Sequence, residues 1–412
     1  MSRLIIYLCF LLVNISCSTA QVQEPTILPG AFNIPAYFPE LVGKRFALVV
    51  NQTSTINGTH LVDTLRSMKN KASKIFTPDQ STTYHDVHID DSIMIKKVFA
   101  PEHGFRGLAD AGEKVKDGLD TKTGLPIVSL YGSNKKPTTE QLTDIDIVVF
   151  DIQDVGTRFY TYISTMHYIL EACAELDKKV IILDRPNPNG MYIDGPILEA
   201  EYKSFVGMHP IPILHGLTVG ELALMINGEG WLAGGLKCDL TVIPVQGWNH
   251  TMTYHLPNKP SPNLPTDLSI ELYPSLCLFE GTDISVGRGT YKPFQQIGHP
   301  SFSDLEYSFT PVRIDGMSKY PKHQNTKCYG VEFTNENVIK GLDLSYLIKF
   351  YSEYDDKDHF FTKYFNTLAG TDQLQQQIKQ GMSEEEIRAT WVEDLEAYRQ
   401  LRKKYLLYED FE

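Results

Sequence analysis

Short apolar runs recur along the first 250 residues of the chain, and most of them are rich in β-branched side chains. They do not alternate strictly between apolar and polar residues, which is typical of strands buried on both faces of a parallel sheet. The pattern predicts six strands, at residues 45–50, 95–100, 126–131, 146–150, 179–183 and 240–244.

Segments with helical spacing lie between these runs. Residues 160–178 carry apolar side chains three and four positions apart, and residues 61–71 and 218–231 are shorter candidates. Thr218 and Glu221 match the capping-box pattern, which marks the start of the last of these helices. Strands that alternate with helices indicate an open, mostly parallel α/β sheet.

The character of the sequence changes after about residue 250. Residues 255–265 read HLPNKPSPNLP, and the following segment is rich in glycine, aromatic residues and loops up to about residue 337. A long helix is predicted at 384–407, where Ser383 and Glu386 form a second capping box. We therefore place a domain boundary near residue 250.

The N-terminus resembles an export signal. Arg3 precedes an apolar run at residues 4–15, and small residues follow up to Ala20, so residues 1–20 are predicted to be a secretory signal peptide. The mature protein is then periplasmic or extracellular. Cys17 is a candidate for a lipid anchor, although residues 14–16 match the usual lipidation box poorly. No other stretch approaches the length of a membrane span.

The composition and the absent motifs exclude several classes of function. The 412 residues are 42% apolar and 22% charged, as expected of a globular protein, and the net charge of −13 argues against nucleic acid as a partner. The sequence lacks a dinucleotide-binding glycine motif, a P-loop, a serine-hydrolase elbow and a zinc-protease motif, so we expect neither a cofactor nor a metal. Outside the predicted signal, the four cysteines are widely spaced, and we expect mostly buried free thiols: Cys173, Cys238, Cys277 and Cys328.

Three of the predicted strands run directly into polar clusters, at residues 101–104, 151–162 and 184–188. Ligands of open α/β sheets bind outside the carboxyl ends of the strands, so we expect a polar pocket there. Carboxylates, amides and arginines suit sugar hydroxyls, and tyrosines can stack on a pyranose ring. The candidate residues are Glu102, His103, Asp151, Gln153, Asp154, Arg158, Tyr160, Tyr162, Asp184, Arg185 and Asn187.

Glycoside hydrolysis needs a proton donor and usually a second carboxylate. Glu102 is the first choice as donor because Pro101 and Gly104 let the backbone turn sharply around it. Asp154 is the next catalytic candidate, and Glu280 is a further candidate from the second domain. Asp151 and Asp184 begin their loops, so capping of the backbone explains them equally well.

Four motifs, FAPEHGFRG, DIQDVGTRFYTY, LDRPNPNG and LFEGTDISVGRGT, resemble in this order the NamZ-type exo-β-N-acetylmuramidases. The resemblance implies hydrolysis of terminal β-1,4-linked N-acetylmuramic acid from the non-reducing ends of peptidoglycan chains or muropeptides. It also implies a Rossmann-like catalytic domain at residues 25–250. A smaller α+β domain at residues 251–412 would close the cleft.

The resemblance also implies roles for individual residues. Glu102 would be the general acid, and the pocket would be closed from the second domain by Glu280, Thr282, Arg288 and Thr290. The lactyl carboxylate of the sugar needs a cation, and bidentate pairing with arginine is the expected mode. The arginines in these loops are Arg106, Arg158, Arg185 and Arg288, of which Arg158 is the first choice.

Two other function classes stay open. An exported sugar-binding protein could enclose the same ligand without chemistry, and turnover of an aryl β-N-acetylmuramide would exclude it. A metal-dependent hydrolase could use His103, Asp151, Asp154 and Asp184, and activity that persists in EDTA would exclude that.

Overall fold

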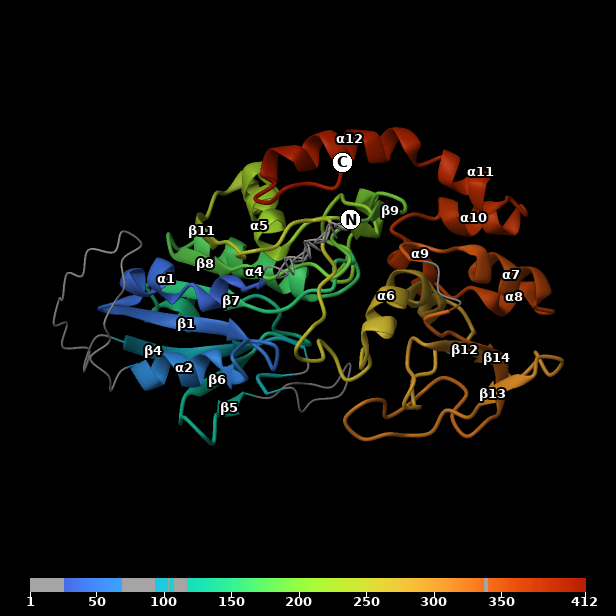
Figure 1. The fold of residues 1–412 in the computed structure, drawn as a ribbon, viewed down its shortest axis with the longest axis horizontal. Coiled ribbons are helices and arrows are strands. Elements are labelled where there is room, and N and C mark those ends of the chain that lie inside the picture. The colour runs from blue at the N-terminus through green and yellow to red at the C-terminus, as the bar shows by residue number, and fades with distance from the viewer. Residues whose placement is uncertain (1–25, 69–92, 103, 107–116, 337–339) are drawn as a thin grey trace, which may run out of the picture.

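The computed structural model of the protein describes residues 26–68, 93–102, 104–106, 117–336 and 340–412. The predicted signal peptide, Cys17 and His103 lie outside the described residues. Figure 1 shows a domain built on a large sheet beside a smaller domain, with the C-terminal helix running above both.

A seven-stranded sheet forms the centre of the large domain. All neighbouring strands pair in parallel except one short edge strand, so the predicted mostly parallel sheet is confirmed. Each of the six predicted strands is present, with ends that differ by at most two residues from the prediction. In spatial order the strands are β11 (Asp239–Ile243), β8 (Lys179–Leu183), β7 (Ile147–Asp151), β1 (Lys44–Val50), β4 (Ile93–Ala100), β6 (Pro126–Ser129) and the antiparallel β5 (Gly118–Leu119).

The strand order is that of a Rossmann fold. Starting from β6, the parallel strands are the third, second, first, fourth, fifth and sixth in the chain, so the order reverses between β1 and β7. Protein atoms fill the space beyond this switch point: Gln153 donates its backbone N–H to Oγ1 of Thr53 at 3.0 Å, and Ser54 donates to the carbonyl of Asp151. The segments that follow β1 and β7 are therefore hydrogen-bonded to each other at the switch point.

Helices cover both faces of the sheet, and alternate strand residues face them. Leu48 belongs to a core formed with α1 (Ile34–Leu41) and α2 (Leu61–Met68). Its neighbour Val49 packs in a second core, with α4 (Tyr162–Ala174) and α5 (Val219–Gly228). This burial on both sides explains the continuous apolar runs of the sequence.

The smaller domain combines a three-stranded antiparallel sheet with helices, as expected of an α+β domain. The sheet was not predicted because its strands are short and lie in the loop-rich segment. Its elements are α6 (Asp267–Leu276), β12 (Gln296–His299), β13 (Tyr307–Phe309), β14 (Cys328–Glu332), α7 (Ser345–Glu353), α8 (Lys357–Phe360), α9 (Tyr364–Ala369) and α10 (Gln373–Lys379).

The prediction of one long C-terminal helix is wrong. Two helices, α11 (Glu384–Ala389) and α12 (Val392–Arg402), meet at Thr390, whose hydroxyl donates to the carbonyl of Ile387 at 2.7 Å. Such back-bonding by threonine competes with the helical ladder. Helix α12 then lies against the large domain, where Tyr398 donates its hydroxyl to the carbonyl of His215 at 2.7 Å.

The four cysteines within the described residues are buried free thiols, which confirms the expectation for them. Among the same residues, no helix has the length and apolar character needed to cross a bilayer.

Candidate active site

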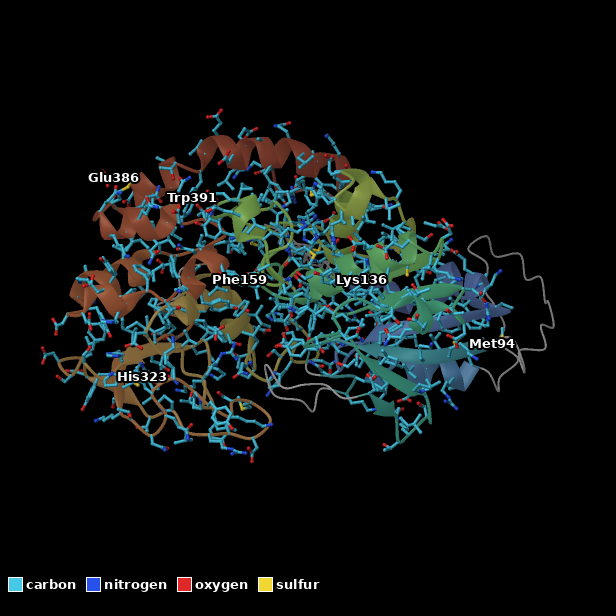
Figure 2. The ribbon with its side chains drawn as sticks, turned by 180° about the vertical axis from the view of Figure 1, so that it is seen from behind. Met94, Lys136, Phe159, His323, Glu386 and Trp391 are labelled. Carbon is cyan, nitrogen blue, oxygen red and sulfur yellow. The ribbon has the colours of Figure 1, made fainter. Side chains whose placement is uncertain are left out.

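A cleft lies where the two domains meet, and Figure 2 shows Phe159 at this junction. Part of it encloses about 460 Å³, within the range of small-molecule sites. The large domain contributes Glu102, Tyr131, Gly132, Lys135, Phe159, Tyr160, Thr161, Tyr162, Phe205 and Val206 to its lining. The linking loop and the small domain contribute Ser261, Asn263, Leu264, Tyr273, Cys277, Glu280, Arg288, Phe294, Tyr364 and Leu368.

Glu102 stands at the carboxyl end of β4, as predicted. The N–H of Gly104 donates to the carbonyl of Pro101 at 3.0 Å, and the φ of +77° at Gly104 completes the turn that directs Glu102 into the cleft. Thr161 donates its hydroxyl to Oε2 of Glu102 at 2.9 Å. Tyr131 also hydrogen-bonds Glu102, and burial together with this negative charge raises the pKa of Tyr131.

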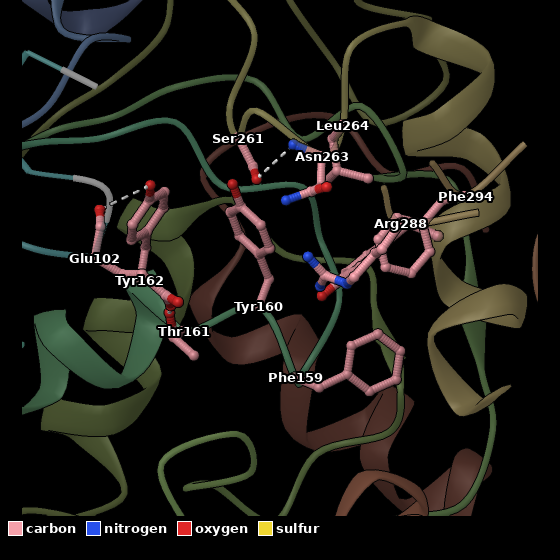
Figure 3. A pocket seen from close by; sticks show the side chains of 11 residues that line it. Glu102, Phe159, Tyr160, Thr161, Tyr162, Ser261, Asn263, Leu264, Arg288 and Phe294 are labelled. Atoms are coloured by element: carbon pink, nitrogen blue, oxygen red, sulfur yellow. Dashed lines mark hydrogen bonds between the residues drawn. The ribbon is translucent and has the colours of Figure 1, made fainter. Parts of the chain in front are cut away.

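Tyr160 and Tyr162 form the wall of the cleft between its two ends. Their rings meet edge to face with centroids 5.0 Å apart, and Tyr160 donates its hydroxyl to the carbonyl of Pro260 at 2.8 Å. In Figure 3 both rings lie between Glu102 and Arg288. They are only 8% and 2% exposed, so they shape the wall more than they offer open stacking faces.

Glu280 and Arg288 form an ion pair on the small-domain side. The guanidinium Nε and Nη2 lie 2.5 and 3.1 Å from the two carboxylate oxygens of Glu280. Burial opposes the charge of Arg288, but the attraction of Glu280 outweighs it and raises the pKa of Arg288. The guanidinium also lies over the ring of Phe294, at 5.0 Å, so several contacts fix its position.

Thr282 and Thr290 do not line the cleft, contrary to the prediction. Thr282 is fully buried and donates its hydroxyl to the carbonyl of Phe279 at 2.9 Å. Thr290 donates to the carbonyl of Gly287 at 2.7 Å. Both hydroxyls satisfy backbone groups and hold the loop that carries Arg288.

Other predicted residues form a buried network beneath the cleft. Arg185 donates from Nε and Nη2 to the two oxygens of Asp151, at 2.6 and 3.0 Å, and neither side chain is more than 2% exposed. Asp184 accepts hydrogen bonds from the hydroxyl of Thr218 and the N–H of Gly220, each at 2.7 Å, and so caps α5. These charges are satisfied by protein groups and do not line the cleft.

The predicted amides are structural as well. Gln153 donates from Nε2 to the carbonyls of Asp154 and Pro186, at 2.8 and 2.7 Å. Asn187 donates from Nδ2 to the carbonyl of Leu217 at 2.9 Å. Neither residue is among those that line the cleft, so the structure does not place them where the prediction put them.

Asp154, the second catalytic candidate, is 4% exposed and does not line the cleft. Its Oδ2 accepts a hydrogen bond from the N–H of Gly156 at 2.7 Å. Burial raises the pKa of Asp154 to about 7. Its carboxyl group therefore belongs to the interior of the loop rather than to the substrate space.

Arg158, the first choice for the lactyl carboxylate, is fully buried and does not line the cleft. Nη1 donates to the carbonyls of Pro196 and Ile211, at 2.7 and 2.8 Å. Nη2 donates to Leu368 and Ala369 of the small domain, at 3.1 and 2.6 Å. Burial lowers the pKa of Arg158 to about 9. The side chain therefore joins the two domains.

Arg106 lies outside the cleft lining. It donates from Nε and Nη2 to the two oxygens of Asp120, at 2.9 and 2.8 Å. Of the four arginines predicted to meet the substrate carboxylate, the structure brings only Arg288 to the cleft.

Two family models together match most of the chain. The N-terminal model of the exo-beta-N-acetylmuramidase NamZ matches residues 70–268, and the C-terminal model matches residues 271–408. The chain belongs to the NamZ family. The family resemblance inferred from the four motifs is therefore confirmed.

Individual relatives agree with this assignment. The chain is 40% identical over 408 residues to the peptidoglycan beta-N-acetylmuramidase NamZ of Bacillus subtilis, covering 94% of this chain and 92% of that protein. Crystal structures of two DUF1343 family proteins from Bacteroides fragilis are 43% and 31% identical, with TM-scores of 0.80 and 0.76. Each comparison covers 93% of this chain and 99% of the other, and the fold prediction is confirmed.

Several lining residues of this NamZ family member were not predicted, and Lys135 is the most informative. It lies in the loop that follows β6, whose carboxyl end meets the same edge of the sheet as that of β4. A search of every strand end would have found it. Ser261 and Asn263 lie in the proline-rich segment that was interpreted only as a linker.

The acidic residues proposed for a metal-dependent hydrolase are engaged elsewhere, in the contacts described above. Among the described residues, Asp283, His299 and His323 do gather their ligand-type atoms within 4.8 Å, inside the small domain. The N–H of Ser301 donates to Nδ1 of His299 at 3.1 Å, which places the ring proton on Nε2. Nε2 then donates to Asp283 at 3.0 Å, so hydrogen bonding accounts for this cluster.

Proposed function

We propose that the protein is an exo-acting glycosidase that releases terminal β-1,4-linked N-acetylmuramic acid from peptidoglycan chains, with Glu102 as proton donor. The carrying observation is the difference between the two carboxylates that line the described cleft. Arg288 engages both oxygens of Glu280, whereas Glu102 receives hydroxyl groups from Thr161 and Tyr131. The activity named for the Bacillus subtilis relative supports this proposal.

The contacts of Glu102 suit a general acid. Hydroxyl groups can rotate, so they accommodate the carboxyl group in both its protonated and its ionised form. The turn at Gly104 fixes the direction of the side chain. A positioned general acid contributes about 10²–10⁴-fold to the rate by protonating the leaving-group oxygen.

Exo-action follows from the second wall of the cleft. In Figure 3 the Arg288 guanidinium and the Phe294 ring stand at the end opposite Glu102, and Arg288 is held there by Glu280. This supports a site that accepts one terminal sugar. Digestion of stem-free peptidoglycan chains should release N-acetylmuramic acid as the first product. Rapid loss of polymer length before any monosaccharide appears, or binding without turnover, would overturn the proposal.

We further propose that residues 1–20 direct export and are then removed, leaving the enzyme in the periplasm or outside the cell. N-terminal sequencing of the protein from fractionated cells tests this. A mature N-terminus near Ala20 supports export without a lipid. A lipid anchor is supported if the protein stays with the membrane until detergent is added and Cys17→Ser makes it soluble without detergent. An intact N-terminus in the cytoplasm contradicts both forms of export.

A further inference from the structure

Two cations line the described cleft, and their surroundings differ. Arg288 is held by both oxygens of Glu280. Lys135 lies instead with its Nζ 4.3 Å from the centroid of the Phe205 ring, and no ion pair within the described residues includes it. Its sequence neighbour Lys136 behaves differently, since it donates to Glu171 and Glu175 at 2.8 and 2.7 Å.

The loop after β6 sets the position of Lys135. Gly132 turns the chain with a φ of +80°, and Asn134 donates from Nδ2 to the carbonyl of Ser129 at 3.0 Å. Tyr131 in the same loop hydrogen-bonds Glu102. The loop therefore brings an ammonium group into the part of the cleft that contains the proposed proton donor.

We propose that Lys135 binds the lactyl carboxylate of the terminal sugar and selects N-acetylmuramic acid over N-acetylglucosamine. This inference rests on the proposed function. The two sugars differ by one lactyl ether, which carries a single negative charge. A protein with a net charge of −13 needs a local cation to hold that group, and the cation–π contact with Phe205 keeps Lys135 in place without neutralising it.

The arginines are less suited to this task. Arg158 and Arg185 are 0% and 2% exposed and are bound by protein acceptors. Arg288 reaches the cleft, but Glu280 already satisfies the bidentate face of its guanidinium. Lys135 offers a compact charge with three donors to an incoming carboxylate.

The test removes the charge from each partner in turn. The kcat/KM of wild type, Lys135→Met and Lys135→Arg is measured on 4-nitrophenyl N-acetyl-β-muramide and on its lactyl methyl ester. Lys135→Met should lower the value for the free acid by about 10- to 100-fold, as for a lost charge-assisted hydrogen bond, and change the value for the ester by less than about threefold. Lys135→Arg should retain most of the wild-type preference for the free acid over the ester. Lys136→Met is the matched control and should leave unchanged the ratio of kcat/KM on the free acid to kcat/KM on the ester.

Equal losses on both substrates would mean that Lys135 only shapes the cleft, and an unchanged ratio would mean that another group reads the charge; either result overturns the inference. In that case Arg288→Met should abolish the preference for the free acid, if Arg288 is the residue that binds the lactyl carboxylate. If wild type turns over neither substrate, the proposed function fails. Calorimetric binding of N-acetylmuramic acid and its methyl ester to wild type and Lys135→Met then still decides the role of Lys135.

Discussion

The carboxyl edge of the large sheet carries two groups of charged residues that differ in depth. In the deep group, Asp151 meets Arg185 in a pair that is almost completely buried, and Arg158 meets only backbone carbonyls. In the cleft, Glu102 contacts hydroxyl groups and Lys135 contacts an aromatic ring. The deep group lies at the ends of β7 and β8, whereas Glu102 and Lys135 lie in the loops after β4 and β6, at the same edge of the sheet.

The comparison shows that burial distinguishes the charged residues that stabilise the fold from those that are available to a substrate at this edge of the sheet. A fully buried charge must be compensated by protein groups, because leaving it without partners costs several kcal/mol. The bidentate Asp151–Arg185 pair is such a case, since each side chain satisfies the other. Groups in the cleft make contacts with hydroxyl groups and an aromatic ring that a substrate can replace, so the residues proposed to act on the substrate are the accessible ones.

The deep group should respond most strongly to loss of one partner. Asp151→Asn leaves the Arg185 guanidinium buried without its counter-charge, and we expect a loss of about 3–5 kcal/mol in the free energy of unfolding. Asp146→Asn breaks the bidentate pair with Arg45 at the exposed start of β1 and is the matched control, with a much smaller loss. Urea denaturation of both variants measures the difference. Equal losses would contradict the distinction by depth.

Arg158→Met should separate stability from specificity. The variant removes hydrogen bonds to carbonyls of both domains, so we expect a loss of about 2–4 kcal/mol in stability. Its preference for the free lactyl acid over the methyl ester should remain that of wild type at a temperature where the variant is folded. A stable Arg158→Met variant without that preference would restore Arg158 as the substrate contact.

Asp154 should give the deep group a pH signature. Its pKa is raised by burial to about 7 in the folded protein, against 3.8 as the ordinary value, so the folded state retains a proton that the unfolded state releases. The contribution of Asp154 to stability is therefore fully present below about pH 4 and is lost as the pH rises from about 4 to about 7, by up to about 1.4 kcal/mol per unit. Asp154→Asn should flatten this slope in urea titrations, leaving the part below pH 6 that comes from Asp184, whose pKa burial raises to about 6. An identical slope in the variant would contradict this.

The sequence predicted the large domain well because its signals are local. Each apolar run is long enough to be buried on both faces, and the capping box at Thr218 forms as expected at the start of α5. The small sheet was missed because β12 and β13 have only four and three residues, between loops. The break at Thr390 was missed because the apolar spacing continues through it.

The site was predicted only in part. The cleft contains Glu102, Tyr160, Tyr162, Glu280 and Arg288, all of which were predicted. Position at a strand end does not reveal how deep a side chain lies, so Arg158 and Asp154 were assigned to the substrate although they are buried. Lys135 was missed because the candidate loops were chosen for their acidic motifs, and the loop after β6 has none.

The measurement that tests the central claim most directly is the activity of Glu102→Gln on two leaving groups. Glutamine keeps the shape of the side chain and its bond to Thr161 but cannot donate the catalytic proton. On natural peptidoglycan chains we expect kcat to fall by about 10²–10⁴-fold. The fall should be much smaller on a 4-nitrophenyl glycoside, whose leaving group needs little protonation.

Thermal unfolding and binding of N-acetylmuramic acid are measured for the same variant and should match wild type, which excludes a folding defect. Glu102 is the proton donor if the loss is large on the natural chain and small on the aryl glycoside. Full activity of Glu102→Gln on the natural chain, or equal losses on both substrates, would contradict the account.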